Sequence, residues 1–135
     1  MLRQTPPGAR LGGVTRGEAD GLRRPPVEGV ERHDGSVVVR LAGELDLYNA
    51  AAVRQAFEQA GAQSPATLVA DLSEVTFVDS TTLGVLVEAQ KGLREGTRLI
   101  LAGPTADVRR ALDVSGLARR FDVRASVDDA LHAGS

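Results

Sequence analysis

Strand-like and helix-like patterns of hydrophobic residues alternate along the chain. Short aliphatic and β-branched runs, bounded by turn residues, predict strands at 27–32, 37–41, 66–71, 97–102 and 121–124. Apolar residues at helical spacing predict helices over 49–63, from Asp79-Ser80 to about 94–96, over 105–112 and from 126 onward. Residues 42–46, between a strand and a helix, are predicted to form a loop.

The spacing within the first two predicted helices also indicates which residues face the core. In the first helix the apolar stripe consists of Ala50, Val53, Ala56, Phe57 and Ala60. The second helix is marked at the same spacing by four apolar residues and one glutamine, namely Leu83, Leu86, Val87, Gln90 and Leu93. Each of these two helices is therefore expected to pack one side against a sheet.

The order of elements indicates an α/β fold. Asp34-Gly35 is the turn signal of an N-terminal β-hairpin, and the strands that follow it alternate with helices. We expect βα units that form a mixed, mostly parallel sheet of about five strands with about four helices. Parallel strands place their following loops at one edge of the sheet, where α/β proteins usually hold their sites. The loop with Glu44 and Asp46 and the Asp79-Ser80 junction should therefore lie close together.

Length and composition predict one folded domain behind an N-terminal arm. With 135 residues the chain can form one core, and residues 26–135 carry all the periodic patterns. Residues 1–25 are rich in Gly, Pro and scattered charge, which predicts a disordered arm. Because aromatic residues make up only 3% of the chain, the core should be aliphatic.

Charge and cysteine content exclude several classes of function. The net charge of −2 argues against nucleic acid or an anionic membrane as a partner, because both attract basic proteins. No apolar run approaches the ~20 residues that span a bilayer, and no signal peptide is recognisable. The chain has no cysteine, which excludes disulfides and thiolate metal sites. We expect a cytoplasmic protein without a membrane or nucleic-acid partner.

Ser80 is the residue with the most informative surroundings. An apolar stretch leads into Asp79-Ser80, and a helical pattern starts directly behind it. A serine at a helix N-terminus can cap the helix, act as a nucleophile or accept a phosphate. The pattern alone leaves these three roles open.

Serine hydrolysis lacks its usual partners in this sequence. The only histidines are His33, in the predicted hairpin turn, and His132, near the C-terminus. Neither belongs to a loop expected at the carboxyl edge of the sheet, where a base for Ser80 would be needed. Val78 and Thr82 occupy the glycine positions of a Gly-x-Ser-x-Gly elbow. We therefore predict no enzymatic activity and no catalytic residues.

An acidic metal or phospho-aspartate site is a further alternative. Glu44, Asp46, Asp71 and Asp79 could converge at one edge, as in a receiver-like Mg²⁺ pocket. A receiver domain needs a lysine late in the chain, but Lys91 lies in the second predicted helix and no lysine follows it. Phosphate-binding glycine motifs are also missing. We expect no metal and no cofactor.

Three segments together resemble the STAS-domain anti-sigma-factor antagonists of bacteria. The first is Leu41-Ala42-Gly43-Glu44-Leu45-Asp46 with Ala50, and the second is Val75-Thr76-Phe77-Val78-Asp79-Ser80-Thr81-Thr82-Leu83-Gly84. The third, from Val108 to Leu117, resembles the family's third helix and its Ser-Gly-Leu ending. The resemblance covers about residues 27–131, nearly all of the predicted domain.

The resemblance implies a regulatory cycle. In this family the serine after the aspartate is phosphorylated by an anti-sigma factor that is itself a serine kinase. A metal-dependent, PP2C-type phosphatase removes the phosphate and restores the binding form of the antagonist. The unphosphorylated antagonist binds that kinase, which then releases its sigma factor. By position the acceptor would be Ser80, with Thr81 as the second candidate. The expected partner-binding residues are Glu44, Asp46, Asp79, Ser80, Thr81, Thr82, Leu83 and Gly84.

One position departs from the family pattern. Position 82 is usually glycine in the family and is Thr82 here. Since threonine is β-branched and glycine is not, the helix entry should be stiffer or differently angled. The alternative function is that of a STAS adaptor or nucleotide-sensing module without a phosphorylation cycle.

Overall fold

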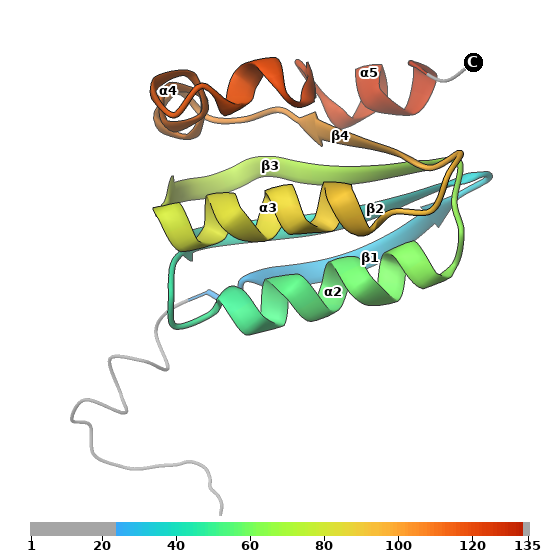
Figure 1. The fold of residues 1–135 in the computed structure, drawn as a ribbon, viewed down its shortest axis with the longest axis horizontal. Coiled ribbons are helices and arrows are strands. Elements are labelled where there is room, and N and C mark those ends of the chain that lie inside the picture. Colours follow the sequence, from blue (N-terminus) through green and yellow to red (C-terminus); the bar gives the residue numbers. More distant parts are fainter. Residues whose placement is uncertain (1–23, 134–135) are drawn as a thin grey trace, which may run out of the picture.

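Five strands form one mixed sheet in a computed structural model that describes residues 24–133 (Figure 1). The strands are β1 (Val27–His33), β2 (Ser36–Leu45), β3 (Thr67–Val78), β4 (Arg98–Ala102) and β5 (Asp122–Arg124). They are hydrogen-bonded in the order β1-β2-β3-β4-β5. β1 is antiparallel to β2, and every later pair is parallel. The predicted fold class is confirmed.

Within the described residues, four helices cover the two faces of this sheet. They are α2 (Ala50–Ala62), α3 (Ser80–Gly92), α4 (Ala106–Val114) and α5 (Val127–His132), with a short 3-10 turn η1 (Leu117–Arg119) after α4. Buried residues of α2, α3 and α4 join one large aliphatic core, and Figure 1 shows α2 and α3 side by side in front of the sheet. α5 packs on the other face, where Ala130 contacts the cluster of Val38, Val69, Ile100 and Ala102.

The predicted helix faces are correct for α2 and turned by one residue for α3. All five residues predicted for the α2 stripe are buried. In α3 the buried residues are Thr82, Val85 and Leu86, while Leu83 and Val87 are only half-buried at its flanks. The helical period was predicted correctly. The centre of the buried face lies one residue earlier because Thr82, which was not among the predicted positions, is packed in the core.

Two strands are longer than predicted, and the predicted loop at residues 42–46 is wrong. β2 runs to Leu45, so that only Asp46 of this segment lies outside the strand, and β3 runs to Val78. The register between them shifts at Arg40/Ala42 and again at Gly43/Glu44, and Gly43 has a φ of 76°. Such irregularities break the period-2 alternation, so the strand ends do not look like strands in the sequence.

The predicted division into an arm at 1–25 and a domain at 26–135 stays a prediction. The predicted arm, 1–25, falls outside the described residues except for Arg24 and Pro25. Arg24 contacts the domain, with ion pairs to Glu28 and to Glu74 (3.1 Å to the latter). Within residues 24–133, no helix has both the length and the apolar character needed to cross a membrane.

Candidate functional site

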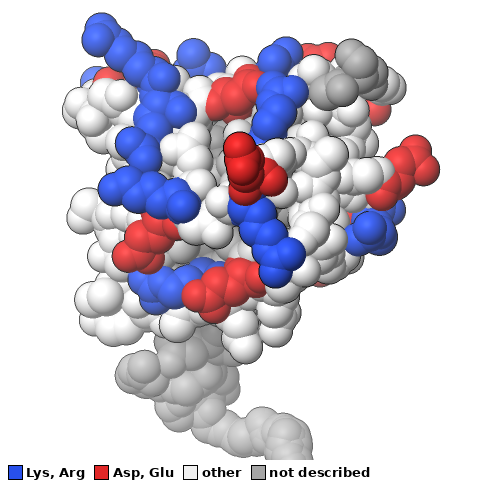
Figure 2. All heavy atoms as spheres, turned by 45° about the vertical axis from the view of Figure 1, so that its right-hand side comes forward, with Lys and Arg blue, Asp and Glu red and all other residues white. Residues whose placement is uncertain are grey.

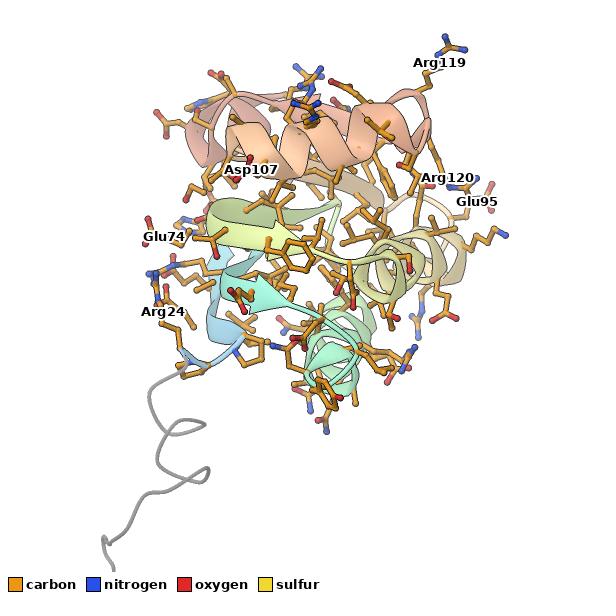
Figure 3. All side chains as sticks on the ribbon, turned by 90° about the vertical axis from the view of Figure 1, so that its left-hand side faces the viewer. Arg24, Glu74, Glu95, Asp107, Arg119 and Arg120 are labelled. Atoms are coloured by element: carbon orange, nitrogen blue, oxygen red, sulfur yellow. The ribbon has the colours of Figure 1, made fainter. Side chains whose placement is uncertain are left out.

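The carboxyl ends of β2 and β3 meet at the edge of the sheet that faces the viewer in Figure 3. Leu45 and Val78 are register partners at the last position of the two strands. The backbone N–H of Asp79 donates to the carbonyl of Leu45 at 3.2 Å, so the pairing continues past the strand ends. The predicted proximity of the 44–46 segment and the Asp79-Ser80 junction is confirmed.

Asp79 joins the two segments through its carboxylate. Oδ1 accepts a hydrogen bond from the backbone N–H of Thr82 at 3.0 Å, which makes Asp79 the N-cap of α3. Oδ2 accepts from the backbone N–H of Leu47 at 3.0 Å, in the loop between β2 and α2. One side chain therefore satisfies a free donor of the helix and fixes the neighbouring loop at the same time.

Ser80 is not the cap of α3. It is the first of the 13 residues of that helix, it is exposed, and its side chain makes no hydrogen bond within the described residues. Asp79 caps the helix because its backbone is extended (φ −104°, ψ −179°), which directs the carboxylate toward the N–H of the third helix residue. The Ser80 hydroxyl is therefore presented to solvent at the positive end of a helix dipole.

The loop between β2 and α2 is closed by its own side chains. Asn49 accepts from the N–H of Asp46 at 2.9 Å and donates to the carbonyl of Glu44 at 2.8 Å. Asp46 accepts from the N–H of Tyr48 at 3.0 Å. The role of Asn49 was missed from the sequence, where an asparagine before a helix indicates an N-cap, although its side chain makes no cap hydrogen bond. The loop backbone is thus held in one shape.

The predicted partner-binding residues differ in exposure. Glu44, Ser80 and Gly84 are exposed, and Asp46, Asp79, Thr81 and Leu83 are half-buried. Thr82 is fully buried, and its Oγ1 has no hydrogen-bond partner among the described residues. Its hydroxyl is therefore inaccessible to a kinase or a partner in this structure, and Thr82 acts on the surface only through the position of α3.

The groups needed for hydrolysis or receiver chemistry are not assembled here. His33 ends β1 and pairs with Ser36 at the start of β2, so it lies at the opposite edge of the sheet. Asp71 lies inside β3, where its Oδ1 accepts from the N–H and the hydroxyl of Ser73. Within residues 24–133 no group of three or more His, Cys, Asp or Glu side chains could hold a metal ion.

Three further apolar side chains at this edge, at Leu47, Tyr48 and Phe77, were not among the predicted site residues. Tyr48 is 87% exposed, Leu47 is 64% exposed and Phe77 is 50% exposed. The first two lie in the loop that Asp79 holds, and Phe77 precedes the last residue of β3. The only sequence signal was that two of the chain's four aromatic residues flank the acidic segments. The edge therefore combines a hydroxyl, carboxylates and exposed apolar groups.

Comparison with known proteins gives the same family from sequence and from structure. The STAS domain model matches residues 28–130. The anti-sigma-F factor antagonist RsfB of Mycobacterium tuberculosis is 31% identical over 102 residues, which cover 76% of this chain and 84% of that protein. The anti-sigma-B factor antagonist of Listeria monocytogenes is 34% identical over 99 residues, covering 73% of this chain and 87% of that protein.

Solved structures agree with this assignment. An anti-sigma factor antagonist from Mycobacterium paratuberculosis superimposes with a TM-score of 0.76 at 36% identity, covering 83% of this chain and 97% of that one. The antagonist SpoIIAA in its unphosphorylated form superimposes with a TM-score of 0.65 at 27% identity, covering 76% and 91%. The chain therefore belongs to the STAS domain family of anti-sigma factor antagonists.

Proposed function

We propose that this protein binds an anti-sigma factor of the serine-kinase type, so that a sigma factor is released, and that phosphorylation of Ser80 ends the binding. The observation that carries the proposal is the exposed Ser80 hydroxyl, which begins α3 directly beside the loop that Asp79 holds. The four relatives compared above are all named antagonists of anti-sigma factors, which supports this class of partner.

The accessibility of the hydroxyls favours Ser80 over its neighbours as the acceptor. Ser80 is exposed, Thr81 is half-buried and Thr82 is fully buried. A kinase must reach the acceptor oxygen with the γ-phosphate in line, which requires an open approach. Thr81 is therefore the second candidate, and Thr82 would have to leave the core to react.

The charges at the edge explain how a phosphate would act as a switch. A phosphoserine adds about −1.5 to −2 charges and three acceptor oxygens. At position 80 it would stand beside Asp79 and near Asp46 and Glu44, so a docked partner would meet bulk and concentrated negative charge. The dipole of α3 would stabilise the exposed phosphate by about 0.3–1 kcal/mol. The domain should therefore stay folded while the partner is lost.

The rest of the cycle follows from this reaction. The kinase partner supplies ATP, so the chain itself needs no cofactor and is a substrate and binding module rather than an enzyme. A PP2C-type phosphatase that binds its own metal ions would remove the phosphate. Because the phosphorylation step uses ATP, we expect the protein to act in the bacterial cytoplasm.

Phosphorylation and binding can be tested on the same protein. The purified chain is incubated with each serine-kinase-type anti-sigma factor of the source bacterium and ATP, and the modified residue is located by mass spectrometry. Ser80→Ala should remove phosphorylation and keep binding, whereas Ser80→Asp should weaken binding at least tenfold with little change in melting temperature. Gln59→Glu, which adds one negative charge on the exposed side of α2, should leave binding unchanged.

Two results would contradict the proposal. Binding without any phosphorylation of Ser80 or Thr81 would favour a STAS adaptor or sensing module instead. Turnover of a small substrate by the isolated chain would favour an enzyme.

A further inference from the structure

Exposed apolar side chains gather at the carboxyl edge of the sheet. The described part of the chain has five large apolar side chains that are exposed, at Val30, Leu47, Tyr48, Phe77 and Val114. Three of these, Leu47, Tyr48 and Phe77, lie within a few residues of the carboxyl ends of β2 and β3. Exposed apolar side chains concentrated near one edge of a sheet favour a site of protein interaction there.

The face around the opposite edge has a different character. Figure 2 shows Lys and Arg side chains interspersed with Asp and Glu over that face. An ion pair at that edge joins Arg98 and Asp122, the first residues of β4 and β5, at 2.7 Å. Mixed charge keeps a protein soluble without favouring one apolar partner. Charged side chains also lie around the carboxyl edge (Figure 3), so the exposed apolar side chains are what distinguishes it.

The use of aromatic residues makes the exposure at the carboxyl edge more informative. The chain contains one tyrosine, three phenylalanines and no tryptophan. Phe57 and Phe121 are buried in the core, whereas Tyr48 and Phe77 are exposed at the same edge. A chain that uses so few aromatic residues therefore leaves two of the four at least half exposed at this edge.

The backbone that carries Leu47 and Tyr48 is fixed while their side chains stay exposed. The N–H of Leu47 is bonded to Asp79 and that of Tyr48 to Asp46, each at 3.0 Å. Asn49 closes the same loop. Since the loop is already ordered, a partner that contacts these side chains loses little conformational entropy. Tyrosine in particular gives a large contact area with few rotatable bonds.

We propose that Leu47, Tyr48 and Phe77 form the apolar anchor through which this protein holds its anti-sigma factor, with Ser80 beside the anchor as the switch. This inference rests on the proposed function and names the side chains that supply its binding energy. The matching surface on the anti-sigma factor is an apolar pocket with a basic rim. The acidic segment around Asp46 and Asp79 would face that rim.

Affinity measurements on exposed-residue variants test the anchor. Tyr48→Ala and Leu47→Ala should each raise the Kd for the kinase-type anti-sigma factor roughly 30-fold, as expected for a central aromatic or aliphatic contact. Val114→Ala is the matched control, because Val114 is 80% exposed at the end of α4, and its Kd should stay within about twofold of wild type. All three variants should melt as wild type does, since none of these side chains is buried.

Chemical footprinting tests the same contact without a substitution. Tyr48 is the only tyrosine, so nitration of tyrosine reports on this position alone. The bound anti-sigma factor should protect Tyr48 at least tenfold, and the Ser80→Asp protein, which is expected to bind weakly, should show no protection at the same concentrations. In kinase assays, Tyr48→Ala should raise the KM for phosphorylation of Ser80 with little change in kcat, because the ring contacts the kinase but not the reacting hydroxyl.

The outcomes separate the anchor from the proposed function. If wild type binds the anti-sigma factor but Tyr48→Ala binds equally well and Tyr48 is not protected, the anchor is refuted and the proposed function stands. If wild type binds none of the serine-kinase-type anti-sigma factors of the source bacterium, both are refuted.

Discussion

Removal of the Asp79 carboxylate should destabilise the domain even though Asp79 lies at its surface edge. In Asp79→Ala, the N–H of Thr82 loses its cap and the N–H of Leu47 loses its only described acceptor. The loss of an N-cap costs about 1 kcal/mol. The loss of a second backbone hydrogen bond costs about 1 kcal/mol more, because water can reach the exposed loop and partly replaces the carboxylate.

The expected total is therefore about 2 kcal/mol of unfolding free energy. For a domain of this size, 1 kcal/mol shifts the melting temperature by roughly 4 °C, so Asp79→Ala should melt about 8 °C below wild type. Asp79→Asn should fall midway, near 1 kcal/mol. Asparagine caps a helix as well as aspartate does, but its amide nitrogen cannot accept from Leu47.

Urea unfolding followed by circular dichroism measures these differences, with thermal melts as a second readout. Asp107→Ala is the matched control, because Asp107 is an exposed acid in the first turn of α4 and not its cap. Its loss removes only a favourable interaction with the helix dipole, about 0.3–0.5 kcal/mol. Hydrogen exchange at Leu47 should become faster in Asp79→Ala and remain unchanged in Asp107→Ala.

Two results would refute the reasoning. If Asp79→Ala loses less than about 0.5 kcal/mol, the carboxylate does not bridge the loop and α3 in solution. If Asp79→Asn is as unstable as Asp79→Ala, the effect comes from charge and not from the two acceptor positions.

Three further predictions concern other parts of the domain. Gly84→Ala should stabilise the fold by about 0.5–1 kcal/mol, because no atom lies within 4 Å of the added Cβ. The same substitution should weaken partner binding, because Gly84 lies about one turn from Ser80. Gly92→Ala, which has the same free space, is the control that should bind normally. Thr82→Val should raise the free energy of unfolding by about 1 kcal/mol in urea titrations, since it removes a buried hydroxyl without a described partner; a loss of stability would show that the hydroxyl is hydrogen-bonded. The hydrogen bond from Arg124 holds the pKa of Asp122 below its usual value of 3.8, so its stabilisation is complete above that value and is lost as the pH falls through the lower folded pKa; acid unfolding should be less steep in Asp122→Asn, and equal slopes would contradict the ion pair.

The parts of the fold that are visible in the sequence are those with regular periods. The five buried positions of α2, the Asp34-Gly35 turn and the short strand β4 all follow simple spacing rules, and the structure has them as expected. The ends of β2 and β3 do not, because the register shifts near Gly43 interrupt the alternation that identifies a strand. The error matters little for the site, since the loop and the Asp79-Ser80 junction remain at the same edge.

Topology predicted that the two segments of the candidate site lie at the same edge of the sheet, as the structure has them, but the roles of their residues depend on geometry. Both Asp79 and Ser80 are residue types that cap helices, and only the backbone angles show that Asp79 does so. The burial of Thr82 and the exposure of Tyr48 reverse what their residue types indicate. Neither follows from residue identity, because both depend on where the helix axis and the loop lie relative to the sheet.

The hydrogen bonds at this edge favour a switch that acts on the surface and not by refolding. Both oxygens of Asp79 are bonded to backbone N–H groups, and Asn49 closes the adjacent loop. These N–H groups already donate to a carboxylate, so a phosphate on Ser80 could bond to them only by displacing Asp79. Since the two kinds of hydrogen bond have similar energy, the exchange would give little driving force to move the loop. The phosphate is more stable in solvent at the start of α3, where it leaves the domain intact and changes only what a partner meets. Unchanged hydrogen exchange at Leu47 after phosphorylation would support this argument, and faster exchange would instead indicate that the loop is released.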